Sequence, residues 1–144
     1  MLVHAKLSLF AFFLYVAQAF AAETISLPLT QLRYFPSGVG NATGELSVGP
    51  SFGDMSKGEH GTFVKMPAGF VSDVHIHTHD YHAVVISGVG VNTKVGGGKD
   101  VALPVGSYWL QKGGEPHVTK CISPTECIFY LSQDDAFDYS PAKK

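Results

Sequence analysis

The sequence has little net charge and lacks the features that mark several common classes of protein. Its 10 lysines and arginines nearly balance its 12 aspartates and glutamates, and the basic residues are scattered along the chain. Scattered basic residues do not form the positive patch that nucleic acid requires, so we expect no nucleic-acid partner. After the first 22 residues, no stretch keeps a helical apolar period for three turns. Long helices are therefore not expected in the fold.

Glycine and proline are abundant where helix formers are few. The chain has 16 glycines and 8 prolines, and these favour short strands joined by tight turns. Strands are expected over 24–29, 62–66, 70–77, 82–87, 88–94, 101–105, 107–111, 117–121 and 127–132. We expect a loop-rich segment over 38–61 and a loosely packed polar tail over 134–144. The pattern predicts an all-β barrel or jelly roll.

The N-terminal segment differs in composition from the rest of the chain. A weakly basic start that includes Lys6 is followed by the almost wholly apolar run 7–16 and then by small residues as far as Ala21. This order predicts a secretory signal peptide, residues 1–21. An uncleaved membrane anchor is the alternative, but the run is shorter than the roughly 20 residues of a spanning helix. We expect a secreted or periplasmic protein with no stable membrane anchor after cleavage, and one domain over residues 22–144.

Only two cysteines are present. Cys121 and Cys127 lie on either side of Pro124, which suggests a turn that brings the two sulfurs together across adjacent strands. An exported protein can keep a disulfide, so we expect one here. The alternative is a pair of buried free thiols.

Histidines are unevenly distributed. Four of the seven lie within eight residues: His75, His77, His79 and His82. Because a strand has a period of two, His75 and His77 project from the same face. Two imidazoles side by side in a core of low charge are costly to bury without a shared partner, and a divalent cation supplies one. The alternative is a cluster of solvated histidines on a surface loop.

The spacing around these histidines resembles the two sequence motifs of the cupin superfamily. Gly69 and Gly88 flank the cluster, each six residues from its nearest histidine, and Pro104-Val105-Gly106 precedes His117. The match covers a motif core of residues 69–117, and its surroundings also resemble an exported bacterial subgroup of unknown function. The resemblance implies a cupin-type β-barrel, which is a double-stranded β-helix jelly roll. It also implies one divalent metal ion (Fe, Zn, Mn, Ni or Cu), a small-molecule ligand or substrate, and a homodimer formed through an edge strand.

One position departs from the family pattern. Tyr81 stands where many cupins have a metal-binding glutamate, with six residues between it and Gly88. The resemblance therefore implies His75, His77 and His117 as metal ligands. Strand parity then points Tyr81 inward, near the metal, and His82 outward. A spacing one residue longer in the motif would instead make His82 the fourth ligand, and the sequence leaves this alternative open.

Two classes of function are compatible with such a site. The three-histidine site resembles those of some cupin dioxygenases. Other cupins are lyases or isomerases in which the metal is a Lewis acid. A cation beside Tyr81 would lower the pKa of the phenol and make it a proton-transfer group. The alternative is a non-catalytic metal- or small-ligand-binding or sensing module. We favour the enzyme, because three protein ligands leave an open coordination position.

Overall fold

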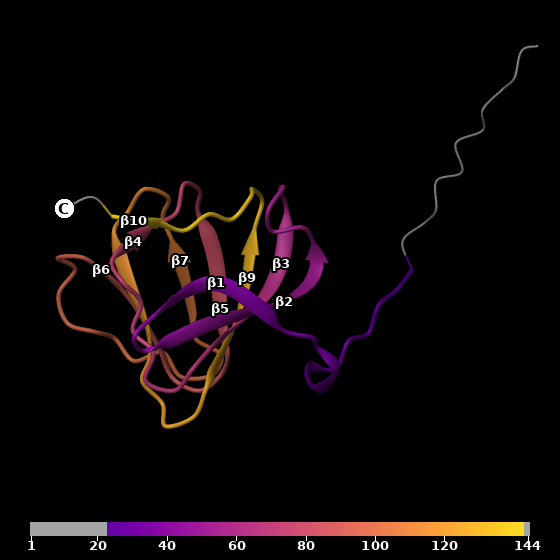
Figure 1. The fold of residues 1–144 in the computed structure, drawn as a ribbon, viewed down its shortest axis with the longest axis horizontal. Coiled ribbons are helices and arrows are strands. Elements are labelled where there is room, and N and C mark those ends of the chain that lie inside the picture. Colours follow the sequence, from indigo (N-terminus) through magenta and orange to yellow (C-terminus); the bar gives the residue numbers. More distant parts are fainter. Residues whose placement is uncertain (1–22, 143–144) are drawn as a thin grey trace, which may run out of the picture.

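The fold is built from strands that surround a common core, as the computed structural model in Figure 1 shows. The structure describes residues 23–142, so the expected signal peptide lies outside the described residues. Over this range the chain forms ten strands, a short 3-10 helix η1 (Leu29–Gln31) and no α-helix. No helix between residues 23 and 142 is long and apolar enough to cross a membrane. The prediction of an all-β fold is confirmed.

The strands form two antiparallel sheets. The larger sheet has the spatial order β1 (Phe35–Asn41), β2 (Gly44–Gly53), β3 (His60–Met66), β9 (Cys127–Gln133), β5 (Tyr81–Ser87) and β7 (Tyr108–Gln111). The smaller sheet has the order β10 (Ser140–Pro141), β4 (His75–Ile76), β8 (His117–Cys121) and β6 (Gly90–Lys94). Strands adjacent in a sheet are often distant in sequence, as β3 and β9 are, so the fold depends on long-range pairing.

The core lies between the two sheets. Along β9, alternate residues from Cys127 to Gln133 are buried, as expected for a strand with one face toward the interior. Phe129 from this strand packs in one cluster with Phe70, Val85 and Cys121, so both sheets contribute to it. Burial of these apolar side chains is the main force that holds the sheets together.

Several expected strands are corrected. Residues 24–29 form no strand, and 101–105 contribute only an isolated bridge between Leu103 and Gly90. The segment expected to be a loop, 38–61, instead contains most of the β1–β2 hairpin. Its glycines permit close packing rather than disorder, since a Cβ on Gly49 would lie 2.9 Å from the Leu32 side chain.

The C-terminal segment is also corrected, because it does not pack loosely. Residues 134–142, which we call the C-terminal strap, run from the end of β9 to the edge of the smaller sheet and add β10 beside β4. The amide of Phe137 donates to the carbonyl of Met55 at 2.7 Å, and that of Ala142 donates to Val74 at 3.1 Å. Backbone hydrogen bonds therefore hold this segment at both ends.

Candidate metal centre

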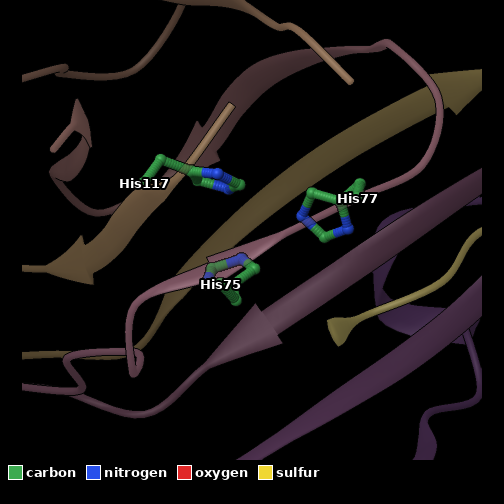
Figure 2. Close-up of side chains that lie close together, drawn as sticks. All are labelled: His75, His77 and His117. Carbon is green, nitrogen blue, oxygen red and sulfur yellow. The ribbon is translucent and has the colours of Figure 1, made fainter. Parts of the chain in front are cut away.

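Strand pairing brings three histidines together. His75 on β4 lies directly opposite His117 on β8, and His77 follows His75 by two residues on the same face. Their ring centroids are 4.1 Å apart for His75 and His117, 4.9 Å for His75 and His77, and 5.1 Å for His77 and His117. Figure 2 shows the three rings directed toward one another. One nitrogen from each lies within 4.8 Å of the others, close enough to bind one metal ion.

Backbone carbonyls fix the tautomer of each ring. The Nδ1 of His75 donates to the carbonyl of Asp73 at 2.9 Å, and the Nδ1 of His117 donates to that of Glu115 at 3.0 Å. The Nδ1 of His77 donates in the same way to the carbonyl of Asp138. A carbonyl only accepts, so each Nδ1 carries the hydrogen and each Nε2 keeps its lone pair. This is the arrangement that metal-binding histidines show in general.

Burial keeps the three rings neutral. The pKa of His75 is lowered to about 3 and that of His77 to about 4. Burial is the main cause, and the neighbouring histidines contribute in the same direction. The hydrogen bonds to Asp73 and Asp138 act in the opposite direction. Burial lowers the pKa of His117 as well. At neutral pH no proton therefore competes for the lone pairs that a metal would take.

The Nε2 of His117 tests whether a metal fits these residues. It is buried and has no hydrogen-bond partner, a state shared among the buried side-chain atoms of residues 23–142 only with the hydroxyl of Tyr34. A buried acceptor without a partner costs free energy, and a metal ion in the centre of the three rings would remove that cost. The donor set fits a first-row divalent metal.

Tyr81 lies beside this cluster, as parity predicts. It is buried on β5, and its ring meets that of His77 edge-on with centroids 5.0 Å apart. Its hydroxyl accepts a hydrogen bond from Nε1 of Trp109 at 3.4 Å. Burial raises the pKa of Tyr81 to about 12, while hydrogen bonds with Trp109 and Thr119 act in the opposite direction. Without an ion, the surrounding protein thus favours the protonated phenol, and the lowering of its pKa by a bound cation stays a prediction.

His82 does not join the cluster. It lies on the outer face of β5, where it is exposed, and its Nδ1 is 2.7 Å from the hydroxyl of Tyr108. This corrects the alternative in which His82 is the fourth ligand, because the period of two turns it away from the barrel interior. His79 is exposed and lies 3.4 Å from Asp135.

A cavity of about 360 Å³ extends from the histidines into the barrel. His75, His77 and Tyr81 line it, and aliphatic and aromatic side chains, mostly from the larger sheet, line most of the rest. Its size and lining are those of a small-molecule site. The histidines therefore face a space that a ligand can enter.

The C-terminal strap completes the site in a way that the sequence did not reveal. The carboxylate of Asp138 accepts hydrogen bonds from the amide and the hydroxyl of Thr78, both at 2.7 Å, while its carbonyl holds His77. The next residue, Tyr139, stacks on His75. A backbone carbonyl leaves no signal in a sequence, so the contribution of Asp73, Glu115 and Asp138 could not be found there.

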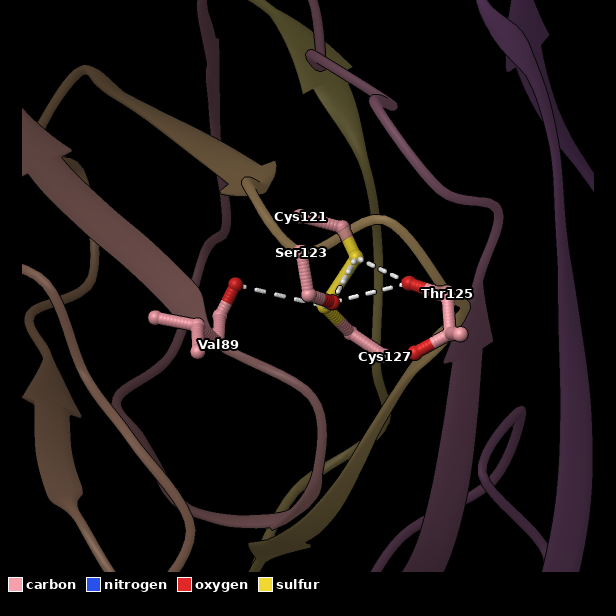
Figure 3. The surroundings of a disulfide bond; sticks show 5 residues. All are labelled: Val89, Cys121, Ser123, Thr125 and Cys127. Carbon is pink, nitrogen blue, oxygen red and sulfur yellow. Dashed lines mark hydrogen bonds between the residues drawn. A yellow bond between two sulfur atoms is a disulfide. The ribbon is translucent and has the colours of Figure 1, made fainter.

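A disulfide supports the strand that carries His117. Cys121 and Cys127 are bonded, which confirms the prediction, and they join the end of β8 to the start of β9. Figure 3 shows the hydroxyl of Ser123 between them, donating to the carbonyl of Thr125 at 2.8 Å. The bond therefore lies at the end of β8 away from the histidines.

The profile of a family described as "Domain of unknown function (DUF4437)" matches residues 33–144. Among the curated proteins, none matches the chain in sequence.

Several solved structures are similar. The polyketide cyclase RemF from Streptomyces resistomycificus is 12% identical with a TM-score of 0.66, over 85% of this chain and 87% of that one. A predicted oxalate decarboxylase from Thermotoga maritima is 19% identical with a TM-score of 0.62, over 77% and 99%. A cupin 2 conserved barrel domain protein from Rhodopseudomonas palustris is 15% identical with a TM-score of 0.62, over 78% of each chain. At these identities the likeness shows the fold alone.

Proposed function

Since the chain belongs to the DUF4437 family and has the cupin fold that its motif spacing predicted, we propose that it is a metal-dependent enzyme acting on a small molecule. His75, His77 and His117 would hold the ion. The observation that carries the proposal is that these three neutral ligands lie beside a cavity, and that no further histidine, cysteine or carboxylate among the described residues joins their group. Catalytic metal sites keep such open positions, whereas structural sites are closed.

The chain's own residues have distinct parts in this proposal. The three rings present their Nε2 atoms, and the carbonyls of Asp73, Asp138 and Glu115 hold the rings in place. Tyr81 receives a hydrogen bond from Trp109, and its O–H would exchange the bond with Thr119 for one to a bound molecule. When bound, the ion supplies Lewis-acid chemistry for a lyase or isomerase, or dioxygen chemistry if it is iron.

Occupancy and ligand exchange test this proposal. Elemental analysis of the chain purified from its own compartment should find about one divalent ion per chain, as three histidines of this geometry require. In Co²⁺-loaded protein, azide should change the visible spectrum, because an open coordination position admits an exogenous anion. A spectrum that azide leaves unchanged would favour the alternative, a closed binding or sensing module. Protein that takes up no metal would refute both the enzyme and the closed metal-binding module.

We also propose that the protein is exported, to the periplasm or outside the cell. The Cys121–Cys127 disulfide supports this, because disulfides persist in oxidising compartments. Intact mass of the secreted or periplasmic protein should show a chain that begins at or near Ala22. Retention of Met1 on that material would contradict export by a cleaved signal. The homodimer expected from the family resemblance stays a prediction.

A further inference from the structure

We propose that the ligand of this site is a small amphiphilic monoanion, with one oxygen-anion head group at the three histidines and an apolar body in the cavity beside them. This inference rests on the proposed function, since the head group needs the metal ion.

The body of the cavity is apolar. Side chains of β2, β3 and β9 form its walls, and they include Leu46, Val48, Val64, Met66, Phe129 and Leu131. Replacing the water along such walls with an apolar group lowers the free energy of the system. A ligand that fills this space therefore gains affinity with each methylene that it buries.

Most polar side chains of the cavity are already engaged with the protein. The hydroxyl of Thr119 donates to the side chain of Asn92 at 2.8 Å, and the carboxylate of Asp138 accepts two bonds from Thr78. The hydroxyl of Tyr81 accepts from Trp109 and is also hydrogen-bonded to Thr119. A sugar or polyol would bury hydroxyl groups without partners here, at a cost in free energy for each.

The charge of the cavity selects the head group. Among the described residues that line it, none is lysine or arginine, and Asp138 is the one acid. Three neutral imidazoles leave the charge of a divalent ion unbalanced, so an anionic oxygen beside the ion is favoured. A nucleotide or sugar phosphate would bring further negative charge with no basic side chain to meet it. The head group is therefore a single carboxylate or enolate rather than a phosphate.

Three carboxylates test the inference on the Co²⁺-loaded chain: acetate, hexanoate and 6-hydroxyhexanoate. They share one head group and differ in the body and its end. We expect hexanoate to bind at least about tenfold more tightly than acetate, because each methylene buried in the cavity favours binding. We expect 6-hydroxyhexanoate to bind at least about threefold more weakly than hexanoate, because its hydroxyl finds no partner. Dissociation constants come from the visible spectrum of the bound Co²⁺.

A matched pair of variants locates the effect. Val64→Thr keeps the shape of a side chain that lines the cavity and adds a hydroxyl, and it should reduce the hexanoate-to-acetate preference at least about threefold. Val84→Thr makes the same change on the outer face of β5 and should leave the preference unchanged.

The outcomes separate this inference from the proposed function. Equal affinity for acetate and hexanoate, or no loss with 6-hydroxyhexanoate, would overturn the amphiphilic ligand while histidine-dependent Co²⁺ binding left the metal site standing. An unchanged preference in Val64→Thr would also overturn it. Failure of the chain to bind Co²⁺ would overturn both.

Discussion

The ring of Tyr139 stacks on the imidazole of His75, with centroids 4.1 Å apart and planes inclined by 20°. The residue before it, Asp138, holds His77 through its carbonyl and Thr78 through its carboxylate. Two of the three candidate ligands thus depend on a segment that lies about 60 residues further along the chain. The C-terminal strap is part of the metal centre rather than an appendage to the barrel.

The strap should therefore set the affinity for metal. Asp138→Ala removes the carboxylate that clasps Thr78, so the carbonyl that orients His77 loses its support. We expect the affinity for Zn²⁺ to fall about tenfold, the lower part of the range for groups that orient metal-binding histidines. Competition with a chelating dye measures this.

The control is Asp134→Ala, an exposed residue of the same strap that lines no part of the cavity. The thermal midpoint of the metal-free protein separates positioning from a general loss of structure, because positioning predicts similar midpoints in both variants. Equal Zn²⁺ affinity in Asp138→Ala and the unmodified chain would show that the clasp does not position His77.

The histidines themselves give a direct test of the site. We expect His75→Ala, His77→Ala and His117→Ala each to lose most of the bound metal, because each removes one of three ligands. His79→Ala and His82→Ala should keep full occupancy, since both side chains are exposed. Elemental analysis of all five variants decides the matter, and equal metal content throughout would place the site elsewhere.

Local pattern was enough to predict much of this centre. A period of two put His75 and His77 on one face and separated Tyr81 from His82, and the structure shows that parity. The number of residues between Gly106 and His117 matched the second cupin motif, in which the length of a strand sets this spacing. These features depend on residues near one another in sequence, so the sequence displays them.

Long-range features were missed for a physical reason. The sequence predicts a loop where the β1–β2 hairpin lies because glycines weaken the strand pattern, yet Gly49 on β2 and Gly61 on β3 are sites of close packing against Leu32 and Tyr130. It predicts a loose tail in place of the strap because the residues there are polar. The order of the strap comes from backbone pairing with β4 and from the Asp138 clasp, neither of which composition reveals.

Acidification should destabilise the metal-free protein. The folded-state pKa values of His75 and His77, about 3 and about 4, lie below the unfolded value of about 6.5. Between these values the unfolded chain binds more protons than the folded one, so stability is full above about pH 6.5 and is lost as the pH falls. The limiting slope is about 1.4 kcal/mol per pH unit for each histidine that is neutral only when folded.

Urea unfolding in the presence of a chelator, between pH 7 and pH 5, measures this slope. The window lies above the ordinary titration range of aspartate, so histidines dominate it. A saturating level of Zn²⁺ should raise the free energy of unfolding throughout this window and leave the slope in place, because the slope comes from protonation of the unfolded chain. A free energy of unfolding that stays constant or rises as the pH falls to 5 would contradict the neutral, buried state of these rings.

Loss of the disulfide should lower stability by a modest amount. The bond closes a loop with a sequence separation of 6 residues, for which the chain-entropy model gives about 2 kcal/mol. Urea unfolding with and without reductant measures the difference. Because the bond lies at the end of β8 away from His117, metal content after reduction should stay the same at native conditions. Unchanged stability in reductant would mean that the bond contributes nothing to the fold.

Tyr81→Phe separates a chemical role for the hydroxyl from a packing role for the ring. The substitution keeps the aromatic ring that packs against His77 and Leu131, and it removes only the oxygen that accepts from Trp109. Burial raises the pKa of this phenol and an ion beside it would lower it, so a chemical role means donating or accepting a proton at the bound molecule. With any substrate that the enzyme turns over, a catalytic hydroxyl predicts a loss of about 100-fold or more in kcat while metal content stays the same.

The lost contact with Trp109 alone would lower stability by about 1 kcal/mol without this effect on kcat, so the two readouts distinguish the roles. Trp109→Phe, which also removes that contact but keeps the Tyr81 hydroxyl, is the matched control and should retain most of the activity. An unchanged kcat in Tyr81→Phe would leave the three histidines and their ion as the whole of the catalytic machinery.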